Sequence, residues 1–254
     1  VLRDPTQRLV SAFFFFQVTR QQVQPLDGHF QEYLQSKSVI PNYYADWLSL
    51  RSMDSFDDDP AKYINQLLDD YDFIAVSSRM DESAVAFSML LNIPLADVLF
   101  LSSKMGSHGD FDLYQGNCTY IVPSFVSPGM QQYFETEQFQ RHIHWDNVLF
   151  QVANASLDRT IDQTLGRDVF DRKLTQFREA QRRVALQCPS QTKMPCSAGG
   201  QRQARSMTKT NCLWADAGCG FSCLDRIATE MGLWGSFKPL NISRIQRTKR
   251  KLKV

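Results

Sequence analysis

Long apolar runs are missing from this 254-residue sequence. No stretch approaches the roughly 20 apolar residues that a bilayer-spanning helix needs, and no signal-peptide pattern is present. Paired C-x-x-C spacing is missing too, and none of the four histidines follows His144. A tetrahedral zinc site in the cysteine-rich C-terminal part would need a ligand from far away, so we expect disulfides there and no bound metal.

A large net charge is also missing, because 28 Lys and Arg oppose 27 Asp and Glu. The balance conceals an asymmetry: residues 1–192 carry 16 basic and 24 acidic side chains, and residues 193–254 carry 12 and 3. The last eleven residues contain six basic side chains and no acidic one, which is typical of a solvated tail or of a contact with an anionic glycan or membrane surface. No nucleic-acid-reading module accompanies them, so we expect no nucleic-acid partner.

Six cysteines are present, and five of them lie between residues 188 and 223. An even number in Gly-rich sequence predicts disulfides formed in an oxidising compartment. The sequence leaves the pairing open, and the local choices are Cys188 with Cys196, and Cys212 with Cys219 or Cys223. Three glycosylation triplets also favour a secretory-pathway lumen. They begin at Asn117, Asn154 and Asn241.

The N-terminal residues carry the signature of a helix start. Asp4 has the spacing of an N-cap, Pro5 suits the first turn, and Gln7 completes a capping box. A helix is predicted over residues 6 to 17, and we expect it to be buried because Phe13 to Phe16 cover every side of it. Ser11 lies about two turns beyond the cap, so Arg3 is expected to extend along that face toward Ser11.

An arginine at a strand end, a helix N-terminus and an inward serine together suit a phosphate dianion. The same spacing also fits an Arg3 that pairs with an acidic neighbour and a Ser11 that bonds to its own helix. The whole string R-D-P-x-x-R-x-V-S, followed by aromatics, resembles the 3′-phosphate-binding motif of sulfotransferases that use 3′-phosphoadenosine 5′-phosphosulfate (PAPS). This resemblance implies that Arg3 and Ser11 hold the 3′-phosphate, and it matches Arg8 to an arginine common in the Golgi carbohydrate branch.

A second segment, YDFIAVSSRMDESAVAFSMLLNIPLADVLFLSSK at residues 71–104, narrows the resemblance. Its pattern predicts a strand over 73–77, a helix capped by Asp81, and a second apolar strand over 98–101. The segment is similar to one in galactose-3-O-sulfotransferases and cerebroside sulfotransferases, and the heparan and uronyl 2-O-sulfotransferases have a comparable unit. We interpret Asp81 and Glu82 as helix capping and dipole compensation rather than as catalytic groups.

The remaining segments give weaker expectations. Residues 18–60 are predicted to be mostly irregular, and their aromatic residues either pack in the core or line an acceptor cleft. Helices are predicted near residues 61–69, and then over 145–166 and 168–187, with a glycine between the last two. Residues 104–120 are predicted to be a loop. The aromatic residues are Tyr43, Tyr44 and Trp47, and the separating glycine is Gly166. The loop contains Lys104–Ser107, which looks like a phosphosulfate-binding turn, but we do not interpret it as one.

The resemblance implies an α/β fold, the P-loop-NTPase-like sulfotransferase fold with a mostly parallel sheet. We expect a partial sulfotransferase domain over residues 1–187, with its N-terminal part missing, and a Cys-rich basic extension over 188–254. In the family, the 5′-phosphosulfate loop precedes the Arg3 motif, so the chain is expected to be a fragment that is inactive alone. A membrane anchor is expected upstream of Val1.

The implied function is transfer of a sulfuryl group from PAPS, the co-substrate, to a carbohydrate hydroxyl, such as the galactose 3-OH of a glycan or glycolipid, in the Golgi. The alternatives are a uronyl 2-O-sulfotransferase and a non-catalytic lumenal glycan-binding protein. The sequence does not identify the catalytic base. The candidates are His29, His108, His142, His144 and Glu32.

Overall fold

The computed structural model describes residues 1–49, 59–101, 108–112, 117–188, 196–203 and 220–235. In this part of the chain helices dominate, and regular strands occur in one antiparallel hairpin. The α-helices are α1 (Pro5–Ala12), α2 (Asp27–Gln35), α3 (Tyr43–Ser49), α4 (Pro60–Asp70), α5 (Met80–Leu91), α6 (Pro128–Phe134), α7 (Glu137–Arg159), α8 (Arg167–Gln187) and α9 (Phe221–Glu230). The strands of the hairpin are β1 (His108–Asp112) and β2 (Asn117–Ile121).

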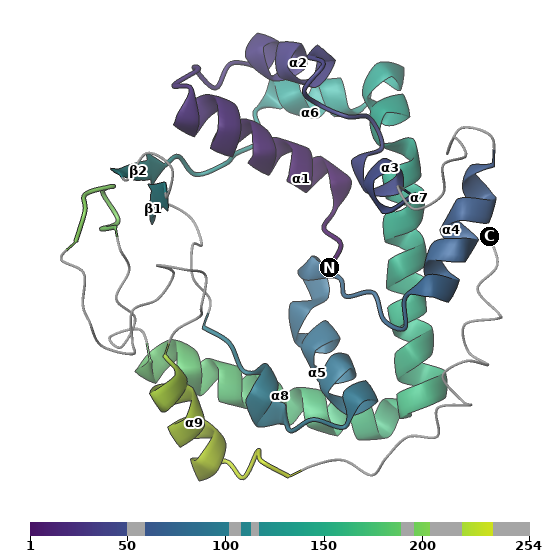
Figure 1. Cartoon of the computed structure of the whole chain (residues 1–254), viewed down its shortest axis with the longest axis vertical. Helices are drawn as coiled ribbons and strands as arrows, with labels where there is room; N and C mark the ends of the chain where they lie inside the picture. Colours follow the sequence, from purple (N-terminus) through teal and green to yellow (C-terminus); the bar gives the residue numbers. More distant parts are fainter. Residues whose placement is uncertain (50–58, 102–107, 113–116, 189–195, 204–219, 236–254) are drawn as a thin grey trace.

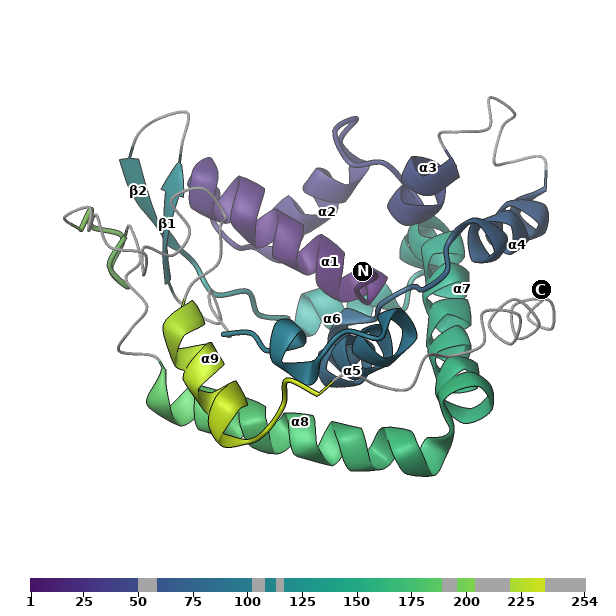
Figure 2. The same ribbon diagram turned by 60° about the horizontal axis from the view of Figure 1, so that its bottom comes forward.

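The long helix α7 connects the two ends of the molecule (Figure 1). Helices α1, α2 and α6 lie together near its N-terminal end, and α8 runs along the opposite end with α5 and α9 packed on it (Figures 1 and 2). Two apolar clusters follow from this arrangement. The first cluster joins α1, α2 and α6 to Phe139 and Ile143 of α7. The second cluster joins α5, α8 and α9 to Leu149, Ala153 and Leu157 of the same helix.

The predicted N-terminal helix is confirmed, and it is longer than expected. Asp4 caps α1, because its Oδ1 accepts the N–H of Gln7 at 2.8 Å. The helix continues without a break as a π-helical segment, Phe13–Arg20. The expectation that every phenylalanine is buried is wrong for Phe16, which is 53% exposed. The segment packs against α2 and β2, and Phe16 lies on the side that they leave open.

The chain ahead of α1 is bound to the segment ahead of α5. Leu2 forms a parallel bridge with Val76: its N–H donates to Ala75 O at 2.7 Å, and its carbonyl accepts from Ser77 N at 2.8 Å. The strand predicted over 73–77 is therefore reduced to this one bridge. The predicted α/β fold with a mostly parallel sheet, and the domain boundary at residue 187, stay predictions.

The predicted Asp81 cap is wrong. A 3-10 turn, Ser77–Arg79, precedes α5, and the helix begins at Met80 with Arg79 at the N-cap position and no capping side chain. Buried Ser83 closes this corner instead, because its Oγ accepts the N–H of Val76 at 3.0 Å. The chain turns tightly before the acidic residues, so they fall inside the first helical turn.

Three other local expectations need correction. The strand expected over 98–101 is absent, since Leu95–Val98 form a 3-10 turn and the next three residues belong to no strand. The region expected to be irregular, residues 18–60, contains α2 and α3. The loop expected over 104–120 contains the β1–β2 hairpin, while Lys104–Ser107 lie outside the described residues.

The other predicted helices are confirmed. The helix expected near 61–69 is α4, and the one expected over 168–187 is α8. The helix expected over 145–166 is α7 with a π-helical end, Thr160–Leu165, and it begins earlier than predicted. Gly166 separates α7 from α8 as expected, with a φ of 86° that favours glycine.

Two disulfides join segments that are distant in sequence, Cys118 to Cys196 and Cys188 to Cys223. The local pairings of Cys188 with Cys196 and of Cys212 with Cys223 are therefore wrong. The reason is that α9 folds back onto the C-terminal end of α8, which brings Cys223 to Cys188 (Figure 2). The remaining two cysteines, Cys212 and Cys219, lie outside the described residues.

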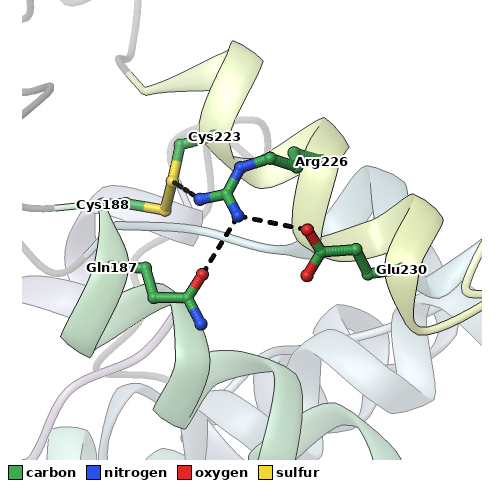
Figure 3. The surroundings of a disulfide bond; sticks show 5 residues. All are labelled: Gln187, Cys188, Cys223, Arg226 and Glu230. Carbon is green, nitrogen blue, oxygen red and sulfur yellow. Dashed lines mark hydrogen bonds and ion pairs between the residues drawn. A yellow bond between two sulfur atoms is a disulfide. The ribbon is translucent and has the colours of Figure 1, made fainter.

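Polar side chains lie beside the Cys188–Cys223 disulfide (Figure 3). The Arg226 guanidinium donates to Gln187 Oε1 at 3.2 Å, to Glu230 Oε1 at 3.1 Å and to Cys223 Sγ at 3.6 Å. Both half-cystines are fully buried. This disulfide therefore fastens α9 to α8 as a structural bond that is closed to solvent.

Replacing both Cys188 and Cys223 with alanine is expected to lower the free energy of unfolding by about 4 kcal/mol, because the bond closes a loop of 35 residues in the unfolded chain. Urea unfolding followed by circular dichroism measures this loss. The matched control is Arg226→Ala, which removes the hydrogen bonds of the exposed guanidinium and keeps the disulfide. It should cost about 1 kcal/mol or less. Equal stability of the double variant and the parent would contradict the structural role.

Candidate functional site

Asp146 of α7 is the most deeply buried charged residue in the described part of the chain, with a fully enclosed side chain. Its Oδ1 accepts the backbone N–H of Tyr44 at 2.8 Å and of Ala45 at 3.0 Å. These donors lie at the N-terminus of α3. Asp146 therefore caps that helix from another element, and its negative charge meets the positive end of the helix dipole.

Arg8 of α1 reaches the same carboxylate. Its Nη2 lies 3.6 Å from Asp146 Oδ2, and its side chain is only 19% exposed. The guanidinium also stands over the ring of Tyr43, at 4.5 Å from the centroid, and over that of Tyr44, at 5.2 Å. A cation held between a carboxylate and two aromatic faces has little rotational freedom, so Arg8 fixes α1 against α3 and α7.

The turn before α3 is fastened to α7 as well. Asn42 adopts a left-handed conformation with a φ of 50°, its N–H donates to His142 O at 2.8 Å, and its Oδ1 accepts from Trp145 N at 2.8 Å. Asn tolerates this backbone region better than most residues because its short side chain bonds locally. We use the name junction cluster for Arg8, Tyr43, Tyr44, His142 and Asp146.

Arg3 lies beside this junction cluster. Its backbone N–H donates to the Tyr44 hydroxyl at 3.3 Å, and its side chain is exposed just ahead of the N-terminus of α1. Ser11 is partly exposed two turns along the same helix. Their joint role in holding a phosphate stays a prediction.

Of the five candidate bases, His142 alone belongs to the junction cluster. His29 is bound through Nδ1 to Gln24 O at 2.9 Å, and His144 points outward, with its ring against Trp145. Glu32 is exposed on α2, and the side chain of His108 lies outside the described residues.

Burial and the charge of Arg8 shift the pKa values of Asp146 and His142. Burial raises the pKa of Asp146, while the N–H of Ala45, the Arg8 charge and the neighbouring N–H groups oppose that rise. Burial, followed by the charge of Arg8, lowers the pKa of His142 below its ordinary 6.5. His142 is therefore neutral at neutral pH.

Sequence reasoning identified Arg8 and listed His142, but it missed Asp146. The signal was present in the buried stripe of α7, which runs through Phe139, Ile143, Asp146 and Leu149 at spacings of four, three and three residues. A carboxylate in an apolar stripe needs buried partners, because burying an unpaired charge is prohibitive. The partners come from distant segments, so the sequence does not name them.

Asp81 and Glu82 belong to a separate ion-pair network. Arg79 contacts Glu82 and also Asp158 of α7, the latter at 2.7 Å. Arg178 of α8 lies 3.5 Å from Asp81. Arg79 thus ties the start of α5 to α7, and the two acidic residues tie α5 to Arg178 of α8.

Of the three aromatic residues considered for an acceptor cleft, Tyr43 and Tyr44 pack on Arg8, while Trp47 is 57% exposed one turn further along α3. An indole ring in that position suits stacking against a sugar ring.

Neither a membrane-spanning helix nor a metal-binding group appears in the part of the chain that the structure describes. None of its helices combines sufficient length and apolarity to cross a bilayer. No three His, Cys, Asp or Glu side chains come together there as metal ligands. Comparisons of the chain with protein-family models, with curated proteins and with solved structures found no match. The assignment of function therefore depends on the residues themselves.

The Asp146→Ala substitution is expected to destabilise the protein by about 3–5 kcal/mol, because it leaves the buried Arg8 guanidinium and the α3 N–H groups without their anion. Chemical unfolding measures this change. Asp162→Ala is the matched control, since its carboxylate pairs with Arg167 at the surface, and should cost about 1 kcal/mol or less. A similar small cost for both variants would contradict the central role of Asp146.

His142 is expected to make stability depend on pH. The pKa of His142 is lower in the folded protein than its ordinary 6.5, so the unfolded chain binds a proton that the folded chain excludes. Its contribution is complete above about pH 6.5 and is lost as pH falls toward the folded value. His142→Gln should therefore lose less stability than the parent between about pH 7.5 and pH 5.5, as measured by urea unfolding. His144→Gln, at an exposed position of the same helix, should follow the parent; if His142→Gln does so too, the assignment is wrong.

Proposed function

We propose that this chain contains the 3′-phosphate-binding part of a PAPS-dependent carbohydrate sulfotransferase of the galactose-3-O-sulfotransferase and cerebroside sulfotransferase type. One observation carries the proposal. The parallel bridge of Leu2 with Val76 leads directly into the exposed Arg3 and the Asp4-capped N-terminus of α1. That is the order of strand end, arginine and helix that the R-D-P-x-x-R-x-V-S motif requires.

The chemistry of these residues suits a phosphate dianion. The guanidinium of Arg3 supplies a charged planar fork, the Ser11 hydroxyl supplies a neutral donor, and the start of α1 contributes the positive end of a helix dipole. Asp4 caps this end of the helix, with its Oδ1 accepting the N–H of Gln7. The side chains of Arg3 and Ser11 would then orient the phosphate of a nucleotide beside α1.

PAPS would supply an activated sulfuryl group, and the reaction would transfer it to a carbohydrate hydroxyl with the adenosine bisphosphate as the leaving group. Positioning and charge stabilisation dominate such displacements, so a rigid binding site for the 3′-phosphate is a direct contribution to catalysis. The exposed Trp47 near the junction cluster supports a glycan or glycolipid acceptor. The two disulfides support the proposed Golgi lumen.

The Arg3→Ala substitution is expected to weaken binding of adenosine 3′,5′-bisphosphate by about 2 kcal/mol, close to thirtyfold in Kd, because a charge-assisted hydrogen-bond donor is lost. Isothermal titration calorimetry of the 254-residue chain measures this loss. The same substitution should leave binding of adenosine 5′-monophosphate unchanged, because that nucleotide has no 3′-phosphate.

The matched control is Arg167→Ala, which removes a surface guanidinium from α8 and should leave both affinities unchanged. Equal affinity of the parent and Arg3→Ala for the bisphosphate would remove Arg3 from the site. Absence of any bisphosphate binding by the parent would contradict the proposed function.

A further inference from the structure

The glycosylation triplet that begins at Asn117 lies on strand β2, at the periphery of the molecule (Figures 1 and 2). Asn117 is the first residue of this strand, and its side chain is exposed. Asn154, which begins another triplet, is half-buried on α7, where its Nδ2 donates to Phe150 O at 2.9 Å. The third, Asn241, lies outside the described residues. Of the two described acceptors, Asn117 is therefore the one open to solvent.

The alternation of side chains along β2 separates the parts of this triplet. Successive residues of a strand point to opposite faces, so Asn117 and Thr119 share one face and Cys118 points to the other. Along the first face the side chains become progressively more exposed, from Ile121 at 7% through half-buried Thr119 to Asn117. Asn117 therefore lies at the solvent end of its face.

The opposite face of the hairpin is covered by the turn that follows Cys196. Cys118 forms a disulfide with Cys196. Gly109 of β1 pairs with Tyr120, so it belongs to the same face as Cys118. A Cβ on Gly109 would collide with the Cys196 side chain and with the carbonyl of Ser197. The disulfide and the turn therefore lie on the side of the hairpin away from the Asn117 side chain.

The π-helical segment that follows α1 packs against β2 near Thr119. Its Arg20 lies 2.9 Å from the carboxylate of Asp110, the residue that pairs with Thr119 across the hairpin. Asn117 is two residues further along the strand, a distance of about 7 Å, and its side chain is exposed. A bulky group attached to Asn117 would therefore extend into solvent with the disulfide and the Arg20 ion pair both in place.

The order of synthesis allows a glycan and a disulfide to form on neighbouring residues. Cys196 follows Cys118 by 78 residues, and a chain is made from its N-terminus. The triplet therefore reaches the lumen while Cys118 still lacks this partner, so the disulfide does not restrict the acceptor at that stage. The hairpin and its disulfide then form with the glycan on the outside.

We propose that Asn117 carries an N-linked glycan, on the strand whose Cys118 is joined to Cys196. The donor is an oligosaccharide activated as a lipid-linked diphosphate. Asn117 Nδ2 forms a bond to C1 of the first sugar, the bond from C1 to the diphosphate breaks, the lipid diphosphate leaves, and one Nδ2 proton is released. Thr119 supplies the hydroxyl that completes the acceptor triplet. Only the lumenal compartment rests on the proposed function, and the two disulfides favour it independently.

Peptide mapping of the 254-residue chain, directed into the secretory pathway of cultured animal cells by a cleavable signal peptide, tests this proposal. Trypsin releases residues 105–141, in which Asn117 is the single acceptor, and residues 194–202, which contain Cys196. Peptide N-glycosidase in water enriched in oxygen-18 converts a glycosylated Asn117 to labelled aspartate. Without reduction, we expect labelled peptide 105–141 to be cross-linked to peptide 194–202.

Two results of the mapping would overturn the proposal. One is an unlabelled peptide 105–141 that is cross-linked to peptide 194–202, because the disulfide shows that the chain reached an oxidising lumen. The other is a labelled peptide 105–141 without the cross-link, because the glycan and the disulfide would then exclude each other.

Substitutions at Thr119 give an independent test. Thr119→Ala removes the acceptor triplet while it keeps Asn117 and Cys118, so the chain should lose one glycan; the matched control Thr119→Ser keeps the triplet and should retain the glycan. Gel mobility of the denatured protein counts the glycans, so the result does not depend on folding of the variants. Equal glycan numbers in the parent and Thr119→Ala would contradict the proposal.

The glycan and the proposed sulfotransferase fail separately, because none of these readouts uses nucleotide. A chain that is labelled at Asn117 but binds no bisphosphate would remove the sulfotransferase and leave this modification site standing. A chain that binds the bisphosphate but is unlabelled at Asn117 would remove the modification site alone.

Discussion

The packing of α1 and α3 on α7 depends on the contacts of the Asp146 carboxylate. This carboxylate lies on α7 between the two apolar clusters, where burying an uncompensated charge would cost several kcal/mol. Two N–H groups of α3 on one oxygen, and the Arg8 guanidinium near the other, compensate it. Because these partners come from α1 and α3, the same carboxylate that is costly to bury also selects how three helices meet.

Hydrogen bonds connect Asp146 to the proposed nucleotide site. Asp146 fixes the start of α3, and Tyr44 in that first turn accepts the backbone N–H of Arg3. On its other side, Arg3 follows Leu2, which is held by the bridge to Val76. The backbone of Arg3 is thus fixed from both directions while its guanidinium stays exposed. A preorganised backbone with a free charged side chain is what recognition of a phosphate needs.

Local patterns predicted the helices that have strong periodicity or a good cap, such as α1, α4 and α8, because those signals act within one turn. They failed where long-range contacts decide. The strand over 73–77 has one described partner residue, Leu2, so only one bridge forms. Cys188 pairs with Cys223 because α9 packs on α8, a tertiary fact that local spacing does not contain. In the candidate site, Arg3, Ser11 and Arg8 came from a motif, whereas Asp146 emerged only from the packing of α3 on α7.

The proposed function depends on Arg3, just ahead of α1, and Ser11, two turns along it, holding one phosphate between them. A crystal structure of the chain with adenosine 3′,5′-bisphosphate tests it most directly. We expect the 3′-phosphate to lie within hydrogen-bond distance of both the Arg3 guanidinium and the Ser11 hydroxyl. A nucleotide bound elsewhere, with neither side chain touching a phosphate, would contradict it.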